Sequence, residues 1–263
     1  MTKKQALVVI SFGTTCPTAR TAIESIEHYL AAQLPDHDYF RAFTSSMVIR
    51  KLQREQNLTV PTPEQLIKTL ASQGYTHVVC QPLHILNGWE YEKMCRQLAP
   101  FAEQFQSFLL GKPMLTDFVD YQECCRIIAK NMPMPQPGEA LVLMGHGSDH
   151  FSNAAYSQLE STMRYLDMES IFVGTVEGFP NLDFICKRLK KQKISHLSLF
   201  PFLIVAGDHA QNDMAGEEES SWKSVLERQG YTVTAHLKGL GEFPETGKLF
   251  ARHLMEATPF PNN

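Results

Sequence analysis

The chain alternates short, continuous runs of apolar residues with longer stretches in which apolar positions recur at helical spacing. Continuous apolar runs are typical of strands buried on both faces of a sheet, and the periodic stretches are typical of amphipathic helices. The runs predict strands at 6–11, 39–43, 77–86, 140–144, 171–176 and 196–205, and the periodic stretches predict helices at 17–34, 46–56, 89–99, 118–131 and 244–257. This alternation predicts an α/β fold of parallel sheets flanked by helices.

One further helix is predicted from its start signal. Thr62 suits the cap position, Pro63 the first helical position, and Gln65 closes a capping box with Thr62. We expect this helix to end at Gly74.

The second half of the chain repeats the pattern of the first. Residues 6–14 align without gaps with 140–148, and residues 76–88 align with 195–207. Matched Gly, Pro and His positions make this more than a general likeness between apolar strands.

A proline-rich connector separates the two halves. Residues 132–138 read Met-Pro-Met-Pro-Gln-Pro-Gly, and prolines at alternate positions favour an extended chain. We therefore expect two similar, pseudo-symmetric α/β lobes that face each other, at 1–134 and 135–263. The last predicted helix either stays with the second lobe or packs back on the first, which would make that lobe discontinuous.

Three polar side chains follow predicted strands of the second half. His146 follows the strand at 140–144, Glu177 follows the run at 171–176, and His209 follows the strand at 196–205. Open parallel sheets bind ligands beyond the carboxyl ends of their strands. Either histidine alone is better explained as an ordinary core or surface residue. Together the three suit a divalent ion such as cobalt, nickel, iron or zinc.

The repeat gives two of these positions a counterpart in the first half. Phe12 aligns with His146, and Glu90 aligns with His209. If the lobes face each other, one wall of the cleft carries metal ligands and the other an aromatic ring and an acid. Such a cleft suits a flat, partly apolar ligand that must meet a metal.

Charge and hydropathy narrow the class of protein. The 263 residues carry 24 Lys and Arg against 28 Asp and Glu, a net charge of −4, which argues against nucleic acid as a partner. The longest apolar stretch, 199–206, is far shorter than the ~20 residues of a membrane helix, and we expect neither a membrane span nor a signal peptide. Six cysteines without C-x-x-C spacing indicate reduced thiols of a cytoplasmic protein. The adjacent pair Cys124 and Cys125 is a weaker candidate for a soft metal.

Familiar catalytic motifs are absent. The sequence contains no G-x-G-x-x-G, no G-x-x-x-x-G-K-[ST], no H-E-x-x-H and no G-x-S-x-G. Dinucleotide, nucleoside-triphosphate and serine-hydrolase functions therefore lose support. The acidic run 217–219 is expected to be the solvated start of a helix.

The chain resembles the anaerobic cobaltochelatases, the sirohydrochlorin cobaltochelatases of oxygen-independent cobalamin synthesis, which are class II chelatases. The resemblance spans nearly the whole chain, and its most specific stretch is Val-Ala-Gly-Asp-His-Ala at 205–210 with Asn-Asp-Met at 212–214. It is also carried by residues 11–14, 40–45, 49–52, 83–88, 90–93, 144–147, 176–177, 180 and 239–242.

The resemblance implies a lyase that inserts cobalt(II), its metal substrate, into a tetrapyrrole and needs no organic cofactor. Its metal ligands would be His146, Glu177 and His209, with His146 also accepting a proton and Glu90 acting from across the cleft. Trp89 departs from the small or acidic residue that the family pattern implies before Glu90, and an indole there would alter how the macrocycle sits or which metal is preferred. The carboxylates of the macrocycle call for cations or helix N-termini, and the backbone amides around Gly13 and Thr14 and around Thr44 and Ser45 are candidate sites for them, with Phe12 as the aromatic ring of this wall.

Other functions stay open at this point. The same ligand set suits an iron or nickel chelatase acting on a related tetrapyrrole, because ligand type alone does not select among these ions. A carrier that binds a tetrapyrrole or a metal without turnover fits the same residues, and a zinc hydrolase fits them less well. The sequence also leaves homo-oligomerisation open.

Overall fold

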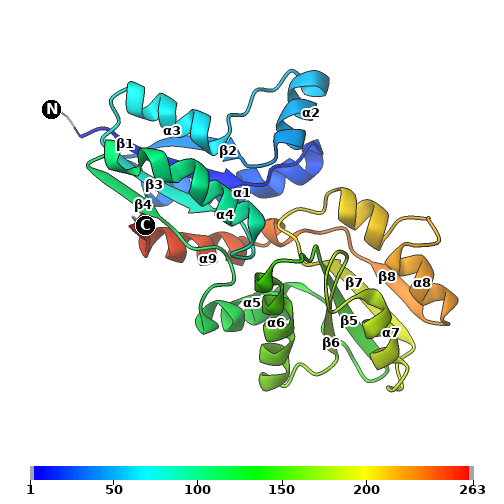
Figure 1. Ribbon diagram of the computed structural model, residues 1–263. Coiled ribbons are helices and arrows are strands. Elements are labelled where there is room, and N and C mark those ends of the chain that lie inside the picture. Colours follow the sequence, from blue (N-terminus) through cyan, green and yellow to red (C-terminus); the bar gives the residue numbers. More distant parts are fainter. Residues whose placement is uncertain (1–2, 261–263) are drawn as a thin grey trace. The chain divides into compact units, whose positions relative to one another are not determined.

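The computed structural model describes residues 3–260, which divide into two compact units (Figure 1). Unit 1 comprises Met1–Thr116 with Pro244–Asn263, and unit 2 comprises Asp117–Phe243. Each unit has its own sheet and its own hydrophobic core. No helix within residues 3–260 is both long and apolar enough to cross a membrane.

Unit 1 is built on a five-stranded sheet of order β2-β1-β3-β4-β9. Its first four strands are parallel, and β9 pairs antiparallel with β4. Helices α3 and α4 pack on one face of this sheet, and α1 packs with α9 (Figure 1). The strands are β1 Gln5–Ser11, β2 Asp38–Phe43, β3 His77–Pro82, β4 Ser107–Leu110 and β9 Thr258–Pro259. The helices are α1 Pro17–Gln33, α2 Ser46–Gln56, α3 Pro63–Ser72, α4 Trp89–Leu98 and α9 Pro244–Met255, with a 3₁₀ turn at Ala99–Gln104.

Unit 2 repeats this plan with a four-stranded, fully parallel sheet of order β6-β5-β7-β8. Helices α7 and α8 contribute to the core on one face, and α5 packs on α6, which contacts β6. The strands are β5 Glu139–Gly145, β6 Ile171–Thr175, β7 His196–Pro201 and β8 Thr232–Ala235. The helices are α5 Phe118–Asn131, α6 Ala154–Tyr165, α7 Leu182–Leu189 and α8 Trp222–Arg228, with a π-helix at His209–Met214 and 3₁₀ turns at Phe151–Asn153 and Leu240–Glu242.

The internal repeat of the sequence corresponds to a repeated sheet. The aligned runs are β1 with β5 and β3 with β7, and each pair occupies the same two central places in its sheet. Central strands of a parallel sheet are covered on both faces, which is why β1 and β5 read as unbroken apolar runs. The predicted α/β class of parallel sheets flanked by helices is confirmed.

The division into units differs from the predicted boundary between 134 and 135. It falls at Thr116 and Asp117, because α5 packs on α6 and so joins unit 2. The proline-rich connector therefore lies inside unit 2, between α5 and β5. Helix α9 packs against α1 and β3, which makes unit 1 discontinuous.

Local signals were more precise for helices than for strand ends. The Thr62 hydroxyl accepts from the Gln65 amide (3.3 Å), and the Gln65 side chain accepts from the Thr62 amide (3.0 Å), so the capping box is formed. The predicted strands at 77–86 and 196–205 were too long, because both strands end at a proline, Pro82 and Pro201. The acidic run 217–219 precedes α8, whose cap is Ser221, and is not part of that helix.

Candidate active site

The carboxyl edge of the unit 2 sheet brings the three predicted metal ligands together. His146 follows β5 directly, Glu177 follows β6 by two residues, and His209 opens the π-helix after β7. The two imidazole rings meet edge to face, with centroids 4.6 Å apart at 87°. A Glu177 carboxylate oxygen lies 3.7 Å from Nδ1 of His146. Neighbouring parallel strands therefore bring His146 close to both Glu177 and His209, which are far from it in the chain.

Close backbone packing holds His146 in place. The Glu177 amide donates to the His146 carbonyl at 2.8 Å, which extends the pairing of β5 with β6 beyond the strands. Gly147 has φ +82°, and a Cβ there would lie 2.7 Å from both the Gly178 nitrogen and the Thr175 Cβ. Only glycine fits this turn without displacing its neighbours.

Each imidazole is held through its Nδ1 atom. Nδ1 of His146 lies 2.9 Å from the Gly147 carbonyl oxygen, and Nδ1 of His209 lies 2.6 Å from a carboxylate oxygen of Asp213. Asp213 stood in the motif that carried the family resemblance, but no role was predicted for it. Asp213 lies four residues after His209, and this spacing could have indicated a contact between the two side chains.

The two histidines are accessible, and the acid beside them even more so. The side chains of His146 and His209 are 45% and 39% exposed, and that of Glu177 is 58% exposed. Among residues 3–260, no group of three or more His, Cys, Asp and Glu side chains is arranged so that it could hold a metal ion. Glu177 approaches the same nitrogen of His146 that faces the Gly147 carbonyl. The three-ligand set of His146, Glu177 and His209 therefore stays a prediction.

Glu90 lies in unit 1, in the first turn of α4, and is paired with Lys93. The Lys93 ammonium is 3.4 Å from both Glu90 carboxylate oxygens and donates to the Thr44 carbonyl at 2.8 Å. The cation thus ties the carboxylate to the end of β2. The placement of Glu90 opposite the histidines stays a prediction.

The predicted substrate-binding residues of unit 1 follow β1 and β2. Phe12 is exposed, whereas Gly13, Thr14, Thr44 and Ser45 are buried. The Thr14 hydroxyl accepts from the Cys16 amide, and the Ser45 hydroxyl caps α2 by accepting from the Val48 amide. These two hydroxyls therefore serve local structure, and Phe12 offers the accessible surface.

His84, which follows β3 in the same unit, was not among the predicted site residues. Its imidazole is buried, and neither ring nitrogen has a hydrogen-bond partner among residues 3–260. Burial, with a smaller contribution from the Lys93 charge, lowers the pKa of His84 to about 4. A buried imidazole whose nitrogens lack hydrogen-bond partners is recognisable only in three dimensions.

His84 is expected to make the protein sensitive to acid. Between an unfolded pKa of 6.5 and the folded pKa of about 4, only the unfolded chain binds the proton, so stability falls as pH falls through this window. Relative to His84→Leu, the wild type should lose about 2 kcal/mol of unfolding free energy between pH 7 and pH 5. Denaturant unfolding at both pH values measures this. The same change at exposed His28 is the control, and equal pH dependence of wild type and His84→Leu would refute the expectation.

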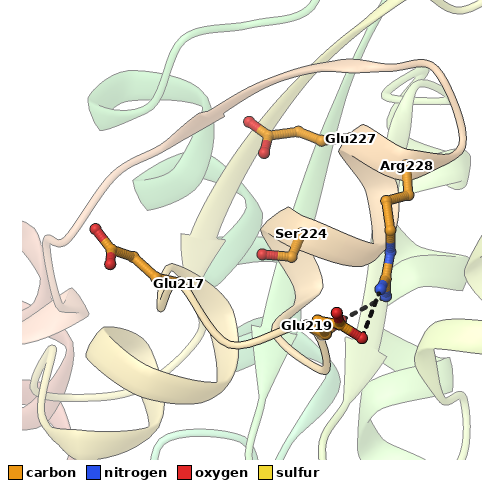
Figure 2. Close-up of a pocket in the computed structure, with 5 residues that line it drawn as sticks. All are labelled: Glu217, Glu219, Ser224, Glu227 and Arg228. Carbon is orange, nitrogen blue, oxygen red and sulfur yellow. Dashed lines mark hydrogen bonds and ion pairs between the residues drawn. The ribbon is translucent and has the colours of Figure 1, made fainter.

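A shallow acidic hollow in unit 2 lies around α8 (Figure 2). It is lined by Glu217, Glu219, Ser224, Glu227 and Arg228. Arg228 pairs with Glu219 at 3.4 Å, and the Glu219 side chain is almost fully exposed. None of the predicted site residues lines this hollow, so it is a solvated surface feature.

Relatives that are named for a chelatase activity match nearly the whole chain. A family model described as cobalt chelatase (CbiK) matches residues 5–259. A sirohydrochlorin cobaltochelatase of Salmonella typhimurium is 40% identical over 255 residues, covering 97% of this chain and 96% of that protein. The sirohydrochlorin cobaltochelatase CbiKC of Nitratidesulfovibrio vulgaris is 29% identical over 263 residues, covering 98% and 91%.

Solved structures agree in fold. SirB from Bacillus subtilis with Fe³⁺ superposes with a TM-score of 0.66 at 17% identity, covering 96% of this chain and 95% of that one. CbiX, described as the terminal enzyme of sirohaem biosynthesis in denitrifying bacteria, gives a TM-score of 0.58 at 18% identity, covering 95% and 98%. The predicted chelatase fold is thereby confirmed. With the family model spanning both sheets and both histidines, the chain belongs to the cobalt chelatase (CbiK) family and is a metal chelatase.

Proposed function

We propose that this protein is a sirohydrochlorin cobaltochelatase that inserts cobalt(II) into sirohydrochlorin in anaerobic cobalamin biosynthesis. One metal dication enters the macrocycle and two pyrrole protons leave, so charge balances. The observation that carries the proposal is the pair of adjacent strand-end imidazoles, 4.6 Å apart, in a chain that is 40% identical to a sirohydrochlorin cobaltochelatase.

His146 and His209 replace water ligands of the arriving metal. Neutral imidazole binds cobalt well, and both rings are accessible from solvent. Glu177 supplies negative charge beside His146 and favours a dication.

Unit 1 contributes to the macrocycle side of the reaction. Phe12 supplies an exposed aromatic face for the flat ring. The Thr44 and Ser45 amides already donate to the Ser11 and Phe12 carbonyls, so the turn at Gly13 and Thr14 is the better of the two predicted places for a carboxylate of the macrocycle. Glu90, held by Lys93, accepts one pyrrole proton, and His146 accepts the other on Nε2 after that nitrogen has released the metal to the macrocycle.

We further propose that the enzyme acts in the cytoplasm. All six cysteines are free thiols, and four of them are buried. Burial raises the pKa of the Cys80, Cys124, Cys125 and Cys186 thiols, which keeps them protonated and unreactive.

A turnover assay under anaerobic conditions tests the function. Cobalt(II), iron(II) and nickel(II) are supplied in turn and in competition, and insertion is followed by the absorbance of sirohydrochlorin. We expect many products per protein molecule and the highest kcat/KM for cobalt. At most one product per protein would identify a carrier, and a clear preference for iron or nickel would identify a chelatase of different specificity.

A further inference from the structure

The π-helix His209–Met214 places a carboxylate beside the second histidine of the site. Asp213 lies four residues after His209, and its Oδ2 is 2.6 Å from Nδ1 of the imidazole. The Ala215 amide donates to the Ala210 carbonyl at 3.2 Å, the wide spacing that defines a π-helix. π-Helical turns are rare and are frequently found at functional sites.

The chemistry of the pair determines which ring nitrogen carries the proton. An ionised carboxylate only accepts hydrogen bonds, so Nδ1 of His209 must be the donor. In the neutral ring, Nε2 then has no proton and keeps a free lone pair. His209 can therefore bind a metal ion through Nε2.

The tautomer of His146 is determined in the same way, by a backbone carbonyl. The Gly147 carbonyl also only accepts, and it lies 2.9 Å from Nδ1 of His146. Both imidazoles therefore keep Nε2 for an ion. For His146 the partner is backbone and cannot be removed by substitution, whereas for His209 it is a side chain.

We propose that Asp213 is a positioning residue, which holds His209 in the Nδ1–H tautomer and orients Nε2 toward the metal substrate. This inference rests on the proposed function, since it takes His209 as a ligand. Partners of this kind raise the basicity of a ligating histidine and fix its ring, and losing one typically lowers metal affinity 10- to 100-fold. The pair is 39% and 44% exposed, so its contribution to fold stability is small and its effect on the ligand dominates.

Cobalt binding to the metal-free protein tests this directly. An anaerobic titration followed by the visible absorbance of cobalt(II) should show about 10- to 100-fold weaker binding for Asp213→Ala. Asp213→Asn keeps an accepting oxygen, and its affinity for cobalt should fall between those of the wild type and Asp213→Ala. In insertion assays the KM for cobalt should rise while the KM for sirohydrochlorin stays within about twofold. Glu218→Ala, which removes one exposed carboxylate from the loop after the π-helix, is the matched control.

The outcomes separate this inference from the proposed function. If His209→Ala binds cobalt as the wild type does, the ligand assignment itself fails. If His209→Ala weakens binding and Asp213→Ala does not, the positioning role is overturned while the function stands. A double variant that binds no more weakly than His209→Ala supports the role, because Asp213 then acts only through His209. A further loss in the double variant would make Asp213 a ligand and overturn it. Nitrogen-15 NMR of the imidazoles should show the Nδ1–H form of His209 in the wild type and its loss in Asp213→Ala.

Discussion

Replacement of His146 or His209 by alanine is expected to lower cobalt insertion by at least about 100-fold, the range over which a proton-accepting or metal-ligating side chain usually acts. The two rings are 4.6 Å apart and accessible, so each is in position to take a coordination place from water. Neither side chain is buried, and its removal leaves no core cavity. The variants should therefore stay folded and lose function.

The measurement is initial insertion rate with cobalt(II), alongside thermal unfolding. His196→Ala is the control, because His196 is an exposed histidine at the amino end of β7, the opposite end from His209. Wild-type rates for both site variants would contradict the assignment of this edge of the sheet as the metal site. An equal loss in His196→Ala would point to a general effect of removing histidine.

Gly147→Ala is expected to destabilise unit 2 by roughly 2–5 kcal/mol and to reduce insertion with it. Left-handed backbone at φ +82° costs a residue with Cβ about 1–2 kcal/mol, and crowding in a packed turn adds about 1–3 kcal/mol. The new Cβ would press on the Gly178 nitrogen and the Thr175 side chain, which flank Glu177. Backbone cannot yield as a flexible side chain does, so the turns bearing His146 and Glu177 must separate.

Gly230→Ala separates strain from crowding. Gly230 has φ +92°, but a Cβ at this position would meet no atom within 4 Å, so only the left-handed backbone is penalised there. Denaturant unfolding should show a loss of about 1–2 kcal/mol for Gly230→Ala, with insertion unchanged. If Gly147→Ala and Gly230→Ala lower the free energy of unfolding equally, crowding of a Cβ at position 147 against Thr175 and Gly178 does not contribute to the loss.

The regular parts of each unit followed from the sequence because their signals are local. Apolar runs and helical spacing predicted β1, β5 and α5, and the Thr62 capping box predicted the start of α3. Strands β4 and β8 were not predicted, since each has only four residues and neither has more than three apolar residues in a row. A strand that short is decided by the neighbour with which it pairs.

The boundary between the units was less predictable for a related reason. The prolines of residues 132–138 do end regular secondary structure. Such a break does not show which hydrophobic core the flanking helices and strands join. Helix α5 lies before them and packs on α6, and α9 returns to α1 in unit 1. Which core a helix joins depends on contacts between residues far apart in the chain.

The sequence by itself determined the α/β class, the repeat of one sheet plan in two units, and the positions of His146, Glu177 and His209 at strand ends. It could do so because strand order and parallel pairing bring successive carboxyl ends to one edge of a sheet. Only the tertiary structure decided that the two imidazoles touch and that Asp213 and the Gly147 carbonyl take their Nδ1 atoms. It also decided that His84 is buried with no hydrogen-bond partner for its ring nitrogens among residues 3–260. Hydrogen bonds and burial depend on distances of a few tenths of an ångström and on packing from every side, and neither is encoded in spacing along the chain.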